Sequence, residues 1–177
     1  MSDSDDSGHG AAGIRDLAAS LARELADARA RDEALAVFEP ARRRLGVTRG
    51  ERMRAVGRVW RLGALLLSAS GELYGTGHVV RAAQPARRSV IALAVAEQRA
   101  YQAAAVRGGF PSGETVNFNV TPIDLGQLER TDASGPLVLR DGVAFVRWSP
   151  IQLDAVAPLA PYLRDRAALL ANPPEGA

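Results

Sequence analysis

The chain contains neither cysteine nor lysine, and each absence excludes a class of chemistry. Without cysteine there is no disulfide framework and no thiolate nucleophile. Without lysine there is no Schiff-base catalysis, no P-loop lysine and no Ser-x-x-Lys nucleophile pair. All 22 basic residues of this arginine-rich chain are therefore arginine.

Histidine is scarce, with 2 in 177 residues. His9 lies in the polar N-terminal stretch, so His78 is the only histidine in a segment that we expect to fold. With no cysteine, only a carboxylate-rich metal site remains, and neither an EF-hand loop nor a His-Glu-x-x-His spacing occurs. We therefore expect no metal site and no cofactor.

Long apolar runs are also absent. The stretch 62–67 is far too short to span a bilayer. The acidic start, residues 1–6, lacks the basic residues and apolar run of a secretory signal. We expect a soluble, cytoplasmic protein with no membrane partner.

Positive charge is concentrated in the middle of the chain. Residues 40–107 hold 13 arginines against 3 acidic residues, whereas residues 1–39 and 108–177 carry net charges of −5 and −3. A basic middle is typical of a docking surface for an anion, or of a surface paired with the chain's own acidic ends. The segment 42–61 has only Trp60 for base stacking and matches no nucleic-acid motif. We favour a solvated or internally paired loop, and nucleic acid is not an expected partner.

Hydrophobic periodicity predicts three helices. The first follows an apolar stripe that begins at Ile14, and it must end by Pro40. The second spans 92–107, and the third has an apolar face over 159–170. A short helical turn is expected at 122–125.

Short apolar runs bounded by turn residues predict about five strands. We expect them at 59–67, 72–81, 115–121, 137–140 and 143–148. An Asp141-Gly142 turn between the last two is the strongest short-range hairpin signal in the chain. The basic stretch 41–57 is interpreted as a loop, with a short strand near Leu45 as an alternative.

These elements predict an α+β fold, in which an antiparallel sheet of about five strands (two hairpins plus one strand) packs with three helices. We expect a single domain over 13–172. Residues 1–12 lack an apolar period and are predicted to form a disordered tail, and residues 173–177 form a C-terminal tail.

Two rows of polar residues are candidates for a binding pocket. Strand alternation places Tyr74, Thr76 and His78 on one face of the predicted strand, and Asn117 and Asn119 form a similar row. If the strands are neighbours, these five residues line one pocket, where His78 transfers a proton with Glu114 or Asp124 as orienting acid. The alternative is the solvent face of a half-exposed sheet, which we favour because alternation generates polar rows in any such sheet.

Two other features are interpreted as packing. Gly75 and Gly77 lie inside a predicted strand, where glycine marks the close approach of a backbone or a ligand. We favour tight packing of a helix against that face, because no Gly-x-Gly-x-x-Gly phosphate-binding pattern follows. Trp60 and Trp148, each next to an arginine, are interpreted as core anchors.

Several short motifs occur in a characteristic order. They are Trp60-Arg61-Leu62-Gly63, Tyr74-Gly75-Thr76-Gly77, Arg107-Gly108-Gly109-Phe110, Pro122-Ile123-Asp124-Leu125 and Asp141-Gly142 followed by Arg147-Trp148. In these motifs the chain, over about residues 42–177, resembles a family of short uncharacterised actinobacterial proteins. Some members carry an automatic glutaminase label, but the resemblance implies no catalytic residues.

The glutaminase label does not suit this sequence. Amidotransferase glutaminases need a cysteine nucleophile, serine glutaminases need Ser-x-x-Lys, and asparaginase-like enzymes need a lysine-assisted threonine. None of these is available without cysteine and lysine.

The sequence leaves three hypotheses for the function. We favour a non-enzymatic binding or interaction protein, with a homo-oligomer as an open alternative. The second hypothesis is a small enzyme with a polar pocket around His78. The third is an anion or nucleic-acid binder that uses segment 42–61.

Overall fold

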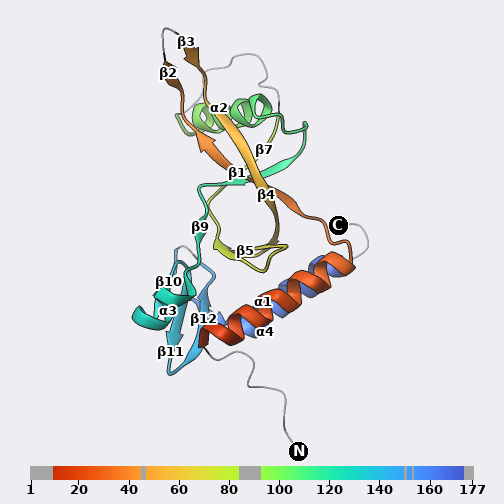
Figure 1. Cartoon of the computed structure of the whole chain (residues 1–177), viewed down its shortest axis with the longest axis vertical. Coiled ribbons are helices and arrows are strands. Elements are labelled where there is room, and N and C mark those ends of the chain that lie inside the picture. The colour runs from red at the N-terminus through yellow and green to blue at the C-terminus, as the bar shows by residue number, and fades with distance from the viewer. Residues whose placement is uncertain (1–9, 45–46, 84–92, 150, 153, 174–177) are drawn as a thin grey trace, which may run out of the picture. The chain divides into compact units, whose positions relative to one another are not determined.

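A computed structural model describes residues 10–44, 47–83, 93–149, 151–152 and 154–173 (Figure 1). Its internal contacts divide the chain into two compact units. Unit 1 comprises Met1–Asp32, Val59–Thr76 and Thr121–Ala177, and unit 2 comprises Glu33–Arg58 and Gly77–Val120. Each unit has a hydrophobic cluster of its own, where the sequence predicts one domain over 13–172.

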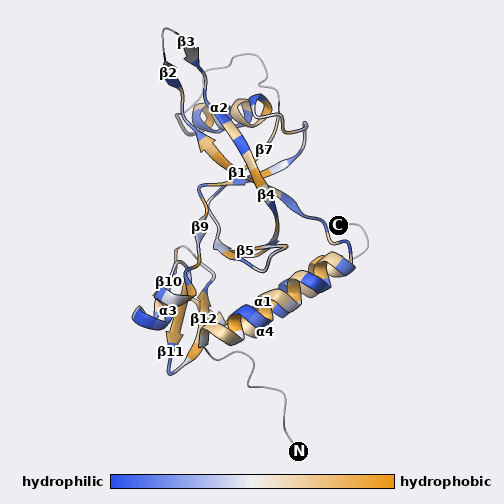
Figure 2. Cartoon of the chain, viewed as in Figure 1, coloured by the Kyte–Doolittle hydropathy of each residue, from blue (hydrophilic) through white to orange (hydrophobic). Residues whose placement is uncertain are grey.

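Unit 1 is organised around two long helices, α1 (Gly10–Asp27) and α4 (Leu159–Ala171), which lie side by side (Figure 1). The predicted stripe of α1 is confirmed, since Ile14, Leu21 and Leu25 are buried. Figure 2 shows hydrophobic and hydrophilic residues on different sides of this helix. The apolar face of α4 is also confirmed, and Pro161 is tolerated because it lies in the first turn.

The α1 helix begins earlier than the sequence predicts. Residues 10–12, assigned to a disordered tail, form its first turn, and Ala11 is 1% exposed. The backbone N–H of Ala11 donates to Glu129 of α3 (Leu125–Thr131), which ties this turn to the unit. The rest of the predicted tail, residues 1–9, lies outside the described residues, as do residues 174–177 of the C-terminal tail.

The strands of unit 1 are antiparallel. One set follows the order β4–β5–β6–β9, and the other is a four-stranded sheet in the order β10–β11–β12–β13. Their bounds are β4(Arg52–Leu62), β5(Leu65–Ser68), β6(Leu73–Gly75), β9(Thr121–Pro122), β10(Ala133–Ser134), β11(Leu137–Arg140), β12(Val143–Arg147) and β13(Val156–Pro158). The predicted turn at 122–125 is the start of α3 (Leu125–Thr131), which Asp124 caps by accepting the Gln127 N–H.

Unit 2 contains β1(Glu33–Glu39), β2(Arg42–Arg44), β3(Val47–Arg49), the first part of β4, β7(His78–Arg81), α2(Leu93–Arg107) and β8(Thr115–Phe118). Its strands follow the order β7–β8–β1–β4, with β8 parallel to β1 and antiparallel to β7. The α2 helix packs on them through Ala104 and Ala105, which are fully buried. The β2–β3 hairpin extends away from these strands (Figure 1).

The α+β class is therefore confirmed, but the finer prediction is wrong. Because β4 belongs to both sets of strands, the order from β7 to β9 contains seven strands rather than about five. The parallel β1–β8 pair makes this arrangement mixed rather than antiparallel. The described residues form four helices, since α3 is a full helix rather than a turn.

Three errors in the strand predictions have a common cause. The sequence treats 59–67 as one strand, but Gly63, with φ of +67°, and Ala64 turn the chain between β4 and β5. It also treats 72–81 as one strand, but β6 and β7 pair with different partners. The predicted 115–121 strand divides likewise into β8 and β9. A continuous apolar run does not show where a strand changes partner.

The N-terminal helix ends well before Pro40, and β1 follows it. Arg29, with φ of 51°, adopts the left-handed conformation, and the Ala30 N–H donates to Leu25 O, closing the helix as a glycine normally does. Because no glycine marks this end, the sequence offered no stop signal. The basic stretch 41–57, which was predicted to be a loop, instead contains β2, β3 and the start of β4.

The Asp141-Gly142 hairpin is confirmed, since β11 and β12 flank it and both turn residues have positive φ, 51° and 77°. We expect Gly142→Val to destabilise the protein by about 1–3 kcal/mol, because a β-branched residue is strained at this φ. The position is otherwise open, with nothing within 4 Å of a built Cβ. Urea unfolding measures the change.

Gly57→Val in β4 is the matched control. A Cβ at Gly57 also meets nothing within 4 Å, but its φ is not positive. A strand position accepts valine, so this variant should unfold no more easily than the parent. Equal stability of the two variants would contradict the hairpin assignment.

Candidate functional site

The structure distributes the five predicted pocket residues rather than gathering them. Tyr74 and Thr76 belong to unit 1 and line two different cavities. His78, Asn117 and Asn119 belong to unit 2. The predicted row of Tyr74, Thr76 and His78 does not form, because β6 ends at Gly75 and β7 begins at His78.

His78 lies in an aromatic cluster. Its ring is 5.3 Å from that of Phe118, its cross-strand partner, and 5.8 Å from that of Tyr101 on α2. The Tyr101 hydroxyl donates to Glu97, and this hydrogen bond raises the pKa of Tyr101. The proposed orienting acids are occupied elsewhere: Glu114 accepts from Arg58, and Asp124 caps α3.

Asn117 has a structural environment. It is 1% exposed, and its Nδ2 donates to Glu33 at 2.7 Å and to Ala34 O at 3.3 Å. Its cross-strand partner is Val79, whereas His78 pairs with Phe118. Since neighbouring strand residues point to opposite faces, Asn117 and His78 do not face one pocket.

Asn119 and the two glycines belong to close backbone packing. Asn119 is exposed in the left-handed conformation, with φ of 52°. A Cβ at Gly77 would overlap the Asn119 carbonyl, and one at Gly75 would lie 2.9 Å from Pro136. Both glycines thus permit tight packing. The groups that approach them are the Asn119 carbonyl and Pro136 rather than a helix.

The arginine-rich segment 42–61 divides into paired and unpaired residues. Glu39 accepts hydrogen bonds from Arg52 Nε at 2.7 Å and from Arg54 Nε at 3.0 Å. Arg58 pairs with Glu114 at 2.8 Å. In contrast, the exposed Arg42 and Arg49 of the β2–β3 hairpin have no ion pair with any described residue.

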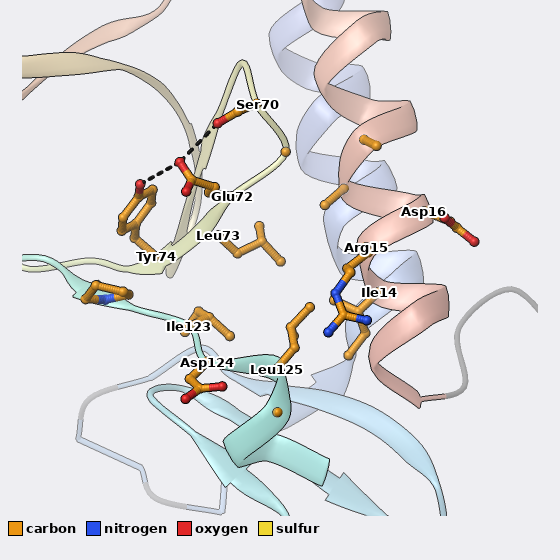
Figure 3. A pocket seen from close by; sticks show the side chains of 15 residues that line it. Ile14, Arg15, Asp16, Ser70, Glu72, Leu73, Tyr74, Ile123, Asp124 and Leu125 are labelled. Atoms are coloured by element: carbon orange, nitrogen blue, oxygen red, sulfur yellow. Dashed lines mark hydrogen bonds between the residues drawn. The ribbon is translucent and has the colours of Figure 1, made fainter.

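A first cavity, of about 680 Å³, lies between α1, the β5–β6 turn and the start of α3 (Figure 3). We call it the carboxylate cavity, for Glu72 and Asp124. Glu72 accepts from Ser70 at 3.0 Å and from Tyr74 at 3.1 Å. Asp124 accepts the Gln127 N–H.

The acidic groups of the carboxylate cavity are therefore already hydrogen-bonded within the protein. Burial, and then the hydrogen bond to Glu72, raises the pKa of Tyr74, so its phenol remains a donor at neutral pH. Figure 3 shows Arg15 reaching into the cavity, whereas Asp16 points away from it.

A second cavity, of about 660 Å³, differs in its charge. We call it the arginine–tryptophan cavity, for Arg147, Arg166 and Trp148. None of the residues described along its wall carries a carboxylate. Arg147 ends β12, and Trp148 follows it with 50% of its surface exposed. Cavities of this size are typical of small-molecule sites.

A tyrosine–arginine pair on α4 also lines this cavity. Tyr162 and Arg166 are four residues apart, which puts them on one face, and the guanidinium lies 5.4 Å from the ring centroid. The Tyr162 hydroxyl accepts the Ala64 N–H at 2.9 Å. A Cβ at Gly63 would overlap this hydroxyl, so glycine is required there.

The two tryptophans have different roles. Trp60 is 7% exposed and donates its indole N–H to Ala30 O at 3.1 Å, which confirms it as a core anchor. Trp148 is half-exposed at a cavity, so its interpretation as a core anchor is wrong. The predicted strand 143–148 ends at Trp148, and this terminal position next to Arg147 was the available signal.

The comparisons and the metal geometry add no further assignment. No protein-family model, curated protein or solved structure matches this chain. Among the described residues, no group of three or more histidine, aspartate or glutamate side chains is placed to hold a metal ion. None of the described helices combines the length and apolar character that crossing a membrane requires.

We expect the Glu39 carboxyl to titrate below its ordinary pKa of 4.5, because Arg52 and then Arg54 donate hydrogen bonds to its charged form. The pairing favours the folded state above pH 4.5 and is lost as the pH falls through the lowered pKa. Carboxyl-detected NMR measures the titration.

Arg52→Ala should move the pKa of Glu39 back toward the ordinary value. Arg43→Ala is the control, because Arg43 is exposed on the neighbouring hairpin and does not contact Glu39 in the structure. An unchanged pKa in Arg52→Ala would contradict the pairing.

Proposed function

We propose that the protein is a non-enzymatic binding protein, which holds an anion carrying a planar ring in the arginine–tryptophan cavity of unit 1. The observation that supports this proposal is the presence of two arginines and an exposed tryptophan on walls without a carboxylate. The proposal narrows the binding class favoured by the sequence to one ligand chemistry.

The charge of the cavity selects an anion. Arginine stays protonated at physiological pH, and its planar fork of donors matches a carboxylate or phosphate. The nearest acid to Arg166 is its neighbour Asp165, at 3.9 Å, which is too long for a hydrogen bond. Arg147 has no ion pair with a described residue. An anion between the two guanidiniums would supply the missing countercharge.

The aromatic groups select a ring. Trp148 lines the cavity and is half-exposed, and an indole face is a stacking surface for a planar group. The Tyr162–Arg166 stack offers a second flat face. Thr76, Thr121 and Ser149 add hydroxyl groups along the wall, which can donate to or accept from the ring substituents.

The site is built before a ligand arrives. Gly63 and Gly135 have positive φ, and Gly75 lies against Pro136, so the backbone itself forms part of the wall. The Ala64 N–H holds the Tyr162 hydroxyl. Such preorganisation lowers the entropy lost on binding.

The chemistry of these side chains suits recognition more than reaction. Guanidinium groups hold a fixed charge, and threonine, serine and indole groups donate hydrogen bonds without changing protonation state at neutral pH. The residue proposed for proton transfer, His78, belongs to the other unit. Binding is therefore the activity that this cavity supports best.

The test uses adenosine 5′-monophosphate and phenyl phosphate as whole probes, since each carries a ring and a phosphate. The partial probes are adenosine, which lacks the phosphate, and inorganic phosphate, which lacks the ring. NMR resolves the two indole N–H signals of the protein. We expect the probes to shift the signal of Trp148, while that of Trp60, which is buried and bonded to Ala30, stays in place. The partial probes should bind more weakly than either whole probe.

Arg147→Ala and Arg166→Ala should each weaken binding at the Trp148 signal by about tenfold, the loss expected for a charge-assisted hydrogen bond. Trp148→Ala removes the reporting indole, so its binding is followed by titration calorimetry, with a similar loss expected for a stacked ring. Arg164→Ala is the matched control, since Arg164 is exposed on the same helix but does not line the cavity. Failure of both whole probes to shift Trp148, or an equal loss in Arg164→Ala, would reject the proposal.

A further inference from the structure

Positive charge is concentrated in unit 2. Among the described residues, unit 2 contains ten arginines and five acidic residues, a formal charge of +5, whereas unit 1 contains ten arginines and eleven acidic residues, a charge of −1. The basic middle of the sequence thus corresponds largely to one compact unit. Within that unit, the local geometry decides which arginines have a countercharge.

The β2–β3 hairpin places two arginines directly opposite each other. Arg42 and Arg49 are Cα partners in antiparallel register, so their side chains lie on the same face. Like charges in this arrangement destabilise a hairpin. Both residues are exposed, and the β2 strand is strongly hydrophilic (Figure 2).

A small cavity lies beside this pair. It measures about 270 Å³, and Arg42, Arg49 and Arg52 line it together with Glu39 and Gly50. We call it the arginine notch. Its one lining carboxylate, Glu39, already accepts from Arg52 Nε and Arg54 Nε. Glu39 carries one negative charge against these two guanidinium groups, so it provides no countercharge for Arg42 and Arg49.

We infer that the arginine notch binds a phosphate group through Arg42 and Arg49, with Arg52 held at its side by Glu39. Arginine forks match phosphate oxygens with paired hydrogen bonds, and a bound phosphate converts the repulsion of the cross-strand pair into attraction. The phosphate belongs either to a free phosphorylated molecule or to the backbone of a nucleic acid. This site is independent of the cavity proposed in unit 1.

Alternation along the hairpin supplies the matched control. Arg43 lies between Arg42 and the turn, pairs with Thr48 and is exposed, but it faces the opposite side and does not line the notch. A general attraction of a basic hairpin for anions would depend on Arg43 as much as on Arg42. Binding in the notch would depend on Arg42 and Arg49 and not on Arg43.

The experiment measures binding of inorganic phosphate, and of a single-stranded oligonucleotide, to the full chain at constant ionic strength. Arginine Nε–H signals report the contacted residues by NMR. We expect phosphate to shift the signals of Arg42 and Arg49. Arg42→Ala and Arg49→Ala should each weaken binding about tenfold, and Arg43→Ala by less than about twofold.

Thermal unfolding gives a second readout, and its phosphate-free arm does not depend on affinity. Without phosphate, Arg42→Ala or Arg49→Ala should raise Tm slightly, because each removes one of two facing like charges, whereas Arg43→Ala should not. With phosphate, Tm should rise in the parent and in Arg43→Ala, and less in the other two variants.

The two probes separate the two sources of the phosphate. Binding of inorganic phosphate alone supports a free phosphorylated ligand, and tight binding of both, with the same arginine dependence, supports a nucleic-acid backbone. Binding that Arg43→Ala weakens as much as Arg42→Ala would overturn the inference, since it would show general electrostatic attraction. So would the absence of any phosphate-dependent shift at Arg42 and Arg49.

Discussion

The buried stripe of α1 holds together the three chain segments from which unit 1 is built. Ile14, Leu21 and Leu25 lie in one cluster with residues of β5, α3 and α4, which come from distant parts of the sequence. A fully buried leucine or isoleucine contributes about 1.5–3 kcal/mol, so this stripe is a large fraction of the stability of a small unit. The chain leaves unit 1 after Asp32 and after Thr76 and returns each time. Contacts between residues close in sequence cannot bring these three segments together, so the long-range contacts of the stripe are needed.

The cavities of unit 1 are consequences of that packing. The α4 helix lies beside α1, and its Tyr162 reaches the β4–β5 turn, where only glycine leaves room for the hydroxyl. Arg166 then stacks on the same ring, while the end of β12 supplies Arg147 and Trp148. The side chains that line the cavity thus come from elements that are distant in the sequence. Tyr162, for example, accepts a hydrogen bond from Ala64, and 98 positions separate the two residues. The charge also differs between the two units, because the excess of arginine over acidic residues lies within unit 2.

Much of the local structure follows from local signals. The stripe of α1, the face of α4 and the Asp141-Gly142 hairpin were predictable, since each depends on residues within a few positions of one another. The candidate site was not. Alternation placed Tyr74, Thr76 and His78 in one row only on the assumption of one continuous strand, and the chain changes partner between Gly75 and His78. The helix end at Arg29 was missed because a non-glycine residue adopts the left-handed conformation there.

By itself, the sequence determined the α+β class, the amphipathic helices and the reactions that a chain without cysteine and lysine cannot perform, because periodicity and residue chemistry act locally. Only the tertiary structure decided which arginines have partners. Arg52 and Arg54 form ion pairs with Glu39 across neighbouring strands. Arg42 is close to Glu39 in the sequence, but its cross-strand partner is Arg49 rather than an acid. The physical reason is that an ion pair depends on distances of a few ångströms between side chains, and strand register sets those distances.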